Sequence, residues 1–227
     1  MPTSPLKTRT RGAIGGFTEL LITLAVGTLV LGSLATMTAQ QAGTIRNQAT
    51  ALQFKKVYAA GTTYIKNEYN SLMNDAGIHC VQCCGSAAQP LGWQDRFSEL
   101  KSMGYLPSYF ENANNYRQEY RFWVGKVCVD NKNTLAAWLV TAPSGAQSTA
   151  IPRAEIAQVA SMAGHKAGYI AYPQDPAAIS MTLTGSEKAI IGALGGWKLK
   201  NVQAPDQGLV FGAVGSNSGY LAAPIVA

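Results

Sequence analysis

The hydrophobic pattern of the chain is dominated by one segment near its N-terminus. From Leu20 to Ala39 nearly every residue is apolar or small, and no charged side chain occurs between Leu20 and Ile45. At a rise of about 1.5 Å per residue, a helix of this length spans about 30 Å, which is the thickness of the hydrocarbon core of a bilayer. The pattern therefore predicts one helix that can cross a membrane.

Beyond Ala39 the chain keeps a helical period while its hydrophobicity falls. No proline occurs from residue 17 to residue 89. We expect one helix over residues 17–74, apolar on all sides in its N-terminal half and with one apolar stripe in its C-terminal half, where it packs on a head domain. The alternative is two helices, broken near Gly43 or Gly61. The stripe consists of Ile45, Ala49, Leu52, Val57, Gly61, Tyr64, Ile65, Tyr69 and Leu72.

Two shorter helices are expected in the head domain, after a loop rich in small residues. Residues 93–103 form an amphipathic pattern that places Phe97 and Leu100 inward. Pro152 opens a second helix that runs to Ala163, because proline is well tolerated in the first helical turn.

The head domain is also expected to contain an antiparallel sheet. Residues 120–129 are rich in aromatic and β-branched side chains, and residues 134–141 follow after a polar turn, which predicts a hairpin. Short strands are expected at residues 168–172, 180–183 and 220–226. The predicted fold class is α+β, with a leader at residues 1–16, a long helix at 17–75 and one exported head domain at 76–227.

Composition and charge predict where the chain is located in the cell, but they do not indicate a ligand. The chain has 47% hydrophobic and 13% charged residues and a net charge of +6. Three of these charges, Lys7, Arg9 and Arg11, precede the apolar segment and are expected to hold the N-terminus in the cytoplasm while the rest is exported. The remaining Lys and Arg residues are scattered, so no nucleic-acid partner is predicted.

Glu19 is the most unusual charged residue, because it lies at the edge of the apolar run. It comes directly after Gly15, Gly16, Phe17 and Thr18. A carboxylate beside a membrane-spanning helix is costly and requires a reason. The junction resembles the processing site of type IV prepilins, in which a short basic leader ends in Gly and an unbroken apolar helix with a conspicuous Glu follows.

This resemblance implies roles for three residues. A membrane prepilin peptidase would cut after Gly16 on the cytoplasmic side, and Phe17 would become the N-methylated terminus. Glu19 would neutralise the terminal amine of a neighbouring subunit in the filament. The family places its Glu fifth after the cut, whereas a cut after Gly16 makes Glu19 third, so a cut before Gly15 or before Gly16 is the alternative.

Two other kinds of N-terminal segment compete with this interpretation. A cleaved secretory signal has an apolar region of about 7 to 15 residues closed by a small-x-small site, whereas the run here is longer and lacks such a site. A plain membrane anchor explains the run and its basic flank but not the Gly-Phe-Thr-Glu junction.

All four cysteines lie outside the apolar segment, at Cys80, Cys83, Cys84 and Cys128. An even number of cysteines in an exported domain favours disulfides. The adjacent Cys83 and Cys84 pair poorly with each other, so we expect one loop cysteine to bond to Cys128. The alternatives are a zinc site made by His79, Cys80, Cys83 and Cys128 or Cys84, free or intermolecular thiols, and a redox-active Cys-x-x-Cys.

The order of the expected elements extends the resemblance. The long helix is followed in turn by residues 100–107, the strand at 134–141, the helix start at 151–152, residues 164–170 and residues 195–197. This order resembles the constant N-terminal region of shufflon-type conjugative pilus tip proteins, the PilV group. In that family a variable C-terminal segment recognises the recipient cell. No such segment follows the strand at 220–226, so the expected role is that of a minor pilin.

No catalytic constellation is recognisable, so we expect neither an enzyme nor a cofactor. Residues 215–219 are not a Gly-x-Ser-x-Gly nucleophile elbow, because Asn217 holds the central place, and His165 is expected to be a surface residue. The expected protein is a minor pilin of a type IVb or conjugative pilus, located in the inner membrane before assembly and in the extracellular pilus afterwards. Its expected partners are other pilin subunits, prepilin peptidase and a recipient-cell or host surface.

Two alternative functions remain open. A pseudopilin of a type II secretion system would share the leader and the long helix. A membrane-anchored binding module would use aromatic side chains of the head for a carbohydrate or peptide, namely Tyr105, Tyr109, Phe110, Tyr116 and Trp123.

Overall fold

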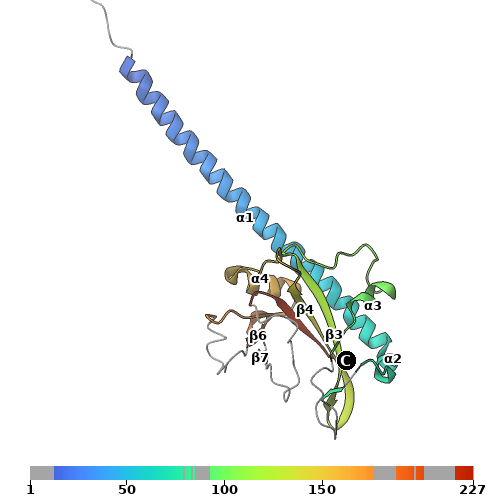
Figure 1. Ribbon diagram of the computed structural model, residues 1–227. Coiled ribbons are helices and arrows are strands. Elements are labelled where there is room, and N and C mark those ends of the chain that lie inside the picture. Colours follow the sequence, from blue (N-terminus) through green and yellow to red (C-terminus); the bar gives the residue numbers. More distant parts are fainter. Residues whose placement is uncertain are drawn as a thin grey trace, which may run out of the picture. The chain divides into compact units, whose positions relative to one another are not determined.

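The computed structural model describes residues 13–78, 80–82, 84, 93–175, 188–196, 198–201 and 218–226. It divides into two compact units, Met1–Ile45 and Arg46–Ala227. The helix α1 (Ala13–Asn67) supplies the described residues of the first unit and opens the second. The chain is therefore α+β, with a long N-terminal helix and an antiparallel sheet in the second unit (Figure 1).

Helix α1 is continuous through both glycines at which a break was considered. Neither Gly43 nor Gly61 interrupts it, so the alternative of two helices broken near these residues is wrong. The helix begins at Ala13, earlier than the predicted start at residue 17. Within the part of the chain that the structure describes, no helix has the combined length and hydropathy that a membrane crossing requires.

A break does occur near the end of the predicted long helix, at Glu68. This residue has φ −97° and ψ 12°, outside the α region, and it separates α1 from the short helix α2 (Tyr69–Asn74). The Glu68 N–H still donates to the Tyr64 carbonyl at 2.9 Å, and the Leu72 N–H donates to the Glu68 carbonyl at 2.8 Å. Backbone groups therefore stay paired across the break, and the expected helix over residues 17–74 becomes two consecutive helices.

The sheet of the second unit is antiparallel along its main path, which runs β3-β4-β8-β5-β6-β7 in the described residues. Two short strands lie along β3, with β1 parallel and β2 antiparallel to it. The strands are β1 (Cys80–Gln82), β2 (Gln94–Asp95), β3 (Gln118–Val129), β4 (Lys132–Pro143), β5 (Gly168–Ile170), β6 (Lys188–Gly192), β7 (Lys198–Asn201) and β8 (Leu221–Val226).

The predicted hairpin is the longest pairing in the sheet. Strands β3 and β4 are in register from end to end, with Trp123 opposite Trp138. Their two-residue turn contains Asp130 and Asn131 at φ +50° and +61°. Positive φ at both central residues matches the right-handed twist of paired strands, and Asp and Asn tolerate it better than most residues.

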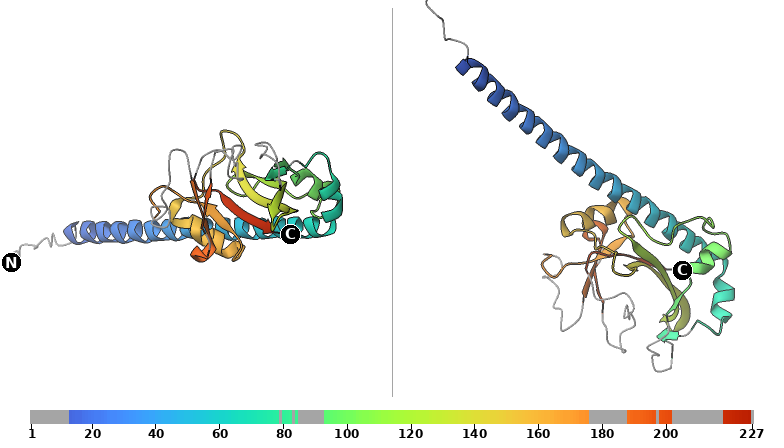
Figure 2. Two further views of the ribbon diagram at one scale, coloured as in Figure 1. Left: turned by 90° about the horizontal axis from the view of Figure 1, so that it is seen from below. Right: turned by 45° about the horizontal axis from the view of Figure 1, so that its top comes forward.

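One face of the sheet is covered by helices. The part of α1 that belongs to the second unit packs there together with α3 (Phe97–Ser102) and α4 (Arg153–Ala163), as Figures 1 and 2 show. Phe97 and Leu100 are buried, as the amphipathic pattern predicted. The largest fully buried side chains of this core are Phe54, Tyr64, Ile65, Ile78, Leu100, Phe122, Leu135, Leu139, Ile151 and Ile156.

The opposite face of the sheet has a second apolar cluster, because side chains alternate along each strand. Trp138 and Val140 belong to this cluster, whereas their neighbours Ala137 and Leu139 belong to the helix-covered core. Strands β5 and β8 occur where short strands were expected, and β1, β2, β6 and β7 were not predicted. Strand β2 occupies the start of the segment 93–103 that was expected to be helical, and the helix there is confined to α3. The strand expected at 180–183 lies outside the described residues.

Candidate functional site

The residues of the expected processing and assembly site lie at the start of α1. The backbone of Gly16, Phe17 and Glu19 is helical, and their side chains lie outside the described part of the chain. The basic residues of the expected leader, Lys7, Arg9 and Arg11, also lie outside it. The roles of these residues therefore stay predictions.

The first unit presents apolar side chains to solvent around its helix. Leu29 is 74% exposed and Leu31 is 69% exposed. Two residues correspond to about 200° of rotation on an α-helix, so these leucines lie on opposite sides. Several further residues of this unit are also exposed, namely Leu24, Leu34 and Met37. A helix that is apolar on all sides is normally covered by lipid or by other protein.

Four described threonine side chains in this part of α1 donate hydrogen bonds within the helix. The hydroxyl of Thr28 donates to the Ala25 carbonyl at 2.9 Å, and that of Thr44 donates to the Gln40 carbonyl at 3.0 Å. Thr36 and Thr38 form the same kind of bond one turn back. The donor of each of these hydroxyls is therefore paired with a backbone carbonyl of the same helix.

A disulfide joins Cys84 of the loop to Cys128 of β3, as expected from the cysteine count. The Cys84 N–H also donates to the Asn133 side chain at 3.2 Å, which ties the loop to the end of the hairpin. Cys80, on β1, is disulfide-bonded as well. Cys83 and His79 lie outside the described residues.

The alternative zinc site is wrong in the form considered. It required Cys84 or Cys128 as a thiolate ligand, and both sulfur atoms are used in their shared disulfide. Within the described residues, no three His, Cys, Asp or Glu side chains gather in a way that holds a metal ion.

The aromatic residues considered for a binding module do not form one surface. Tyr116 is buried, and Tyr105, Phe110 and Trp123 are half-buried against the two apolar clusters. Tyr109 is 87% exposed. Four of these five aromatic residues therefore pack in or against the core, and Tyr109 is the exposed one.

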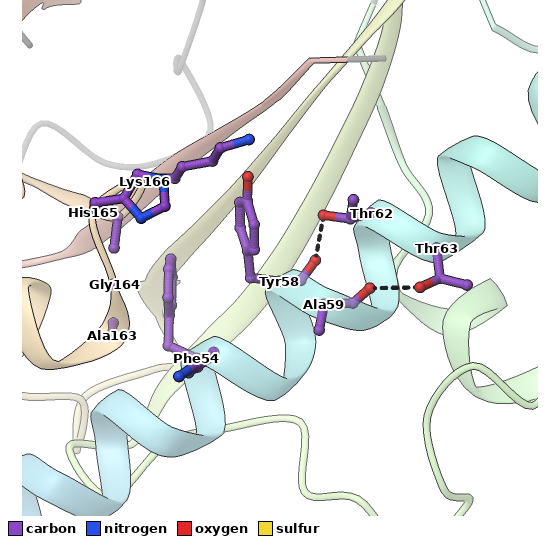
Figure 3. Close-up of a pocket in the computed structure, with 11 residues that line it drawn as sticks. Phe54, Tyr58, Ala59, Thr62, Thr63, Ala163, Gly164, His165 and Lys166 are labelled. Atoms are coloured by element: carbon purple, nitrogen blue, oxygen red, sulfur yellow. Dashed lines mark hydrogen bonds between the residues drawn. The ribbon is translucent and has the colours of Figure 1, made fainter.

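A groove of about 580 Å³ opens in the second unit between α1 and the turn that follows α4. One wall is α1, which contributes Phe54, Lys55, Tyr58 and neighbouring residues up to Thr63. The other wall is the segment 163–167, which carries His165 and Lys166. Figure 3 shows the rings of Phe54 and Tyr58 side by side on α1, both directed toward this segment.

The groove combines an apolar floor with basic side chains at its edge. Phe54 is buried and Tyr58 is half-buried, and the Tyr58 hydroxyl donates to the Pro224 carbonyl of β8 at 3.2 Å. Burial raises the pKa of Tyr58 above its ordinary value, so the ring stays neutral. Lys55, His165 and Lys166 are exposed, and no Asp or Glu is among the residues that line the groove.

A buried polar cluster holds α1 to α4 beside this groove. The Tyr116 hydroxyl donates to Asn47 Oδ1 at 2.5 Å, and Asn47 Nδ2 donates to Glu155 Oε2 at 2.6 Å. The Arg46 guanidinium lies 4.1 Å from the centre of the Tyr116 ring, as a cation–π contact. Burial, and then the bond to Glu155, raise the pKa of Tyr116.

A second polar cluster joins α1, α3 and the loop after α2. Arg96 forms an ion pair with Asp75 at 2.6 Å and another with Glu99. The Tyr64 hydroxyl donates to Glu99 Oε2 at 2.5 Å. These contacts fix α3 to α1 and to the loop after α2.

His165 is exposed, as predicted, whereas the groove itself was not predicted from the sequence. The two walls are about a hundred residues apart in the chain, and no local motif marks either of them. No protein-family model, curated protein or solved structure matches the chain.

Proposed function

We propose that this chain is a type IV pilin-like subunit, a minor pilin at or near the tip of a type IVb or conjugative pilus, with roles in assembly and attachment. The observation that carries the proposal is the apolar surface of the first part of α1. It has no charged side chain from residue 20 to residue 45, and leucines on opposite sides of it are exposed. A membrane before assembly, and the helices of other subunits afterwards, would cover this surface.

The second unit supports the same proposal. The rest of α1 packs one face onto an antiparallel sheet, which suits a helix that presents a globular head. The disulfide between Cys84 and Cys128 suits export to an oxidising compartment. In this proposal the chain is cut near Gly16, Phe17 becomes the terminus, and Glu19 neutralises a neighbouring terminal amine.

The first test is mass spectrometry of the mature N-terminus from membranes of the native host. A terminus at or next to Phe17, with one added methyl group, is the expected result. A membrane-bound protein that retains Met1 contradicts the proposal, because an unprocessed leader blocks the terminal amine that Glu19 would neutralise.

The second test compares the wild type with Glu19→Ala and Glu19→Gln. An ionised carboxylate at the bilayer centre costs about 2.5 to 3.5 kcal/mol, and a neighbouring amine in a filament offsets this cost. Both variants should be inserted, processed and folded, yet their amount in sheared pili relative to membranes should fall sharply. Incorporation of Glu19→Ala at the wild-type ratio would rule out this role and favour a plain anchor.

A further inference from the structure

The loop after α3 presents Tyr109 as an exposed aromatic side chain on a backbone that hydrogen bonds hold in place. Its neighbours hold the loop, since Leu106 is buried and Phe110 packs 6.1 Å from the Tyr120 ring. The Phe110 N–H donates to the Pro107 carbonyl at 2.9 Å, and Lys101 Nζ donates to the Phe110 carbonyl at 2.8 Å. Tyr109 is nevertheless 87% exposed. An exposed aromatic on a fixed loop loses little entropy when it binds a partner.

An acidic residue accompanies this aromatic side chain. Glu111 lies two residues after Tyr109 and is exposed. Tyrosine is one of the residues that dominate the binding energy of protein interfaces. The loop therefore offers an exposed aromatic anchor and, two residues further along the chain, an exposed carboxylate.

The groove between α1 and the turn after α4 is complementary to this loop, because it has an aromatic floor and a basic edge. Its floor contains Phe54 and Tyr58, and its edge carries Lys55, His165 and Lys166 without any acidic lining residue. A volume of about 580 Å³ falls in the range of pockets that enclose small ligands, so an aromatic side chain fits. An aromatic edge against Phe54 or Tyr58 and a carboxylate near the lysines would both be favourable.

We propose that copies of this chain bind each other through their second units, with Tyr109 of one copy in the groove of the next and Glu111 beside Lys55 and Lys166. Helices α3 and α4 lie on opposite sides of the α1 segment that belongs to this unit (Figures 1 and 2). The loop and the groove are thus on different sides of the head. Such a contact is head-to-tail, so it leaves a free loop on one copy and a free groove on the other.

The contact involves the second unit alone, and it stands independently of the pilus proposal. Its test therefore uses the full chain in membranes, whether or not pili form. Two copies with different affinity tags are produced together, and a photo-reactive benzoyl-phenylalanine replaces Tyr109 in one of them. Since Tyr109 makes little contact with its own head, folding should be unaffected.

Irradiation should give an adduct that contains both tags, and its cross-linked peptide should map to residues 54–63 or 163–167. The matched control carries the photo-reactive residue at Val129, which is 52% exposed at the hairpin end. It should give no adduct with the groove. A Tyr109 adduct with another protein only, an adduct outside the groove, or no adduct would each overturn the proposal.

A charge exchange tests the orientation of the contact. Glu111→Lys in every copy, or Lys166→Glu in every copy, should lower the yield of the two-tag adduct by about threefold, as expected for an exposed ion pair. The double variant restores opposite charges and should recover the wild-type yield. Losses that simply add in the double variant would show that these side chains do not face each other.

Discussion

Gly61 of α1 faces the ring of Phe122 in β3, and a Cβ atom on this glycine would lie 2.7 Å from Phe122 Cε2. The same atom would lie 3.2 Å from Ile225 Cδ1 of β8. Both side chains belong to the buried core, so neither has free space to move into. The absence of a side chain at Gly61 therefore allows the helix to approach the sheet this closely.

Replacing Gly61 with Ala should destabilise the second unit. Overpacking of a core costs about 1 to 3 kcal/mol, and the better helix propensity of alanine returns only about 1 kcal/mol. Thermal unfolding of the full chain in detergent, followed by near-UV circular dichroism, measures the difference. Gly43→Ala is the matched control, because a Cβ atom there meets nothing within 4 Å. Equal melting temperatures for the two variants would contradict the close approach.

Replacement of two core tyrosines with Phe should affect the free energy of unfolding differently. Tyr64→Phe removes the bond to Glu99 and should cost about 1 kcal/mol in the free energy of unfolding. Tyr120→Phe removes a buried hydroxyl that has no partner among the described residues, so stability should stay the same or rise. Denaturant unfolding of both variants under the same conditions gives the comparison. A larger loss for Tyr120→Phe would mean that its hydroxyl has a partner.

The Cys84–Cys128 bond should stabilise the second unit. It closes a segment with a sequence separation of 44. A crosslink of this span is worth about 2 to 4 kcal/mol, because it restricts the unfolded chain. A double variant, Cys84→Ser with Cys128→Ser, should lower the midpoint of denaturation accordingly. If it unfolds at the wild-type midpoint, the bond lies in a segment that unfolds independently of the core.

Asp75 should make the fold sensitive to acid. The Gly77 N–H and then the Arg96 guanidinium lower the pKa of Asp75 below its ordinary 3.8. Because the folded state favours the carboxylate, this contribution is present above about pH 4 and is lost as the pH falls through the lowered pKa. Asp75→Asn should therefore be less stable than the wild type at neutral pH, and the difference should shrink toward pH 2. Asp130→Asn, in the exposed hairpin turn, should show no such convergence.

The sequence predicted elements whose signals are local. The spacing of Phe97 and Leu100 identified the inner face of α3, and the polar segment around Asp130 and Asn131 identified the hairpin turn. Strand β6 was missed because its apolar run is short, and such a run does not distinguish a strand from a buried helical segment. The break at Glu68 was missed because the sequence around it keeps a helical period.

The groove depended on contacts that no local pattern encodes. Tyr58 and Lys166 are brought together only when α4 packs beside α1, and that packing uses the buried bonds among Asn47, Tyr116 and Glu155. The disulfide partner of Cys128 was likewise left open among the loop cysteines, since spacing alone does not fix which sulfur meets it. Both the groove and the disulfide pairing of Cys128 depend on tertiary contacts.

The position of β8 in the sheet bears on how the head is made. This strand lies between β4 and β5, although it follows all the other described strands in the chain. The β3–β4 hairpin and the β5–β6–β7 group therefore meet only through a segment that leaves the ribosome after both. Closing such distant pairings is slow. The two halves of the sheet can therefore join only after β8 has been synthesised, so the complete sheet is a late product of folding.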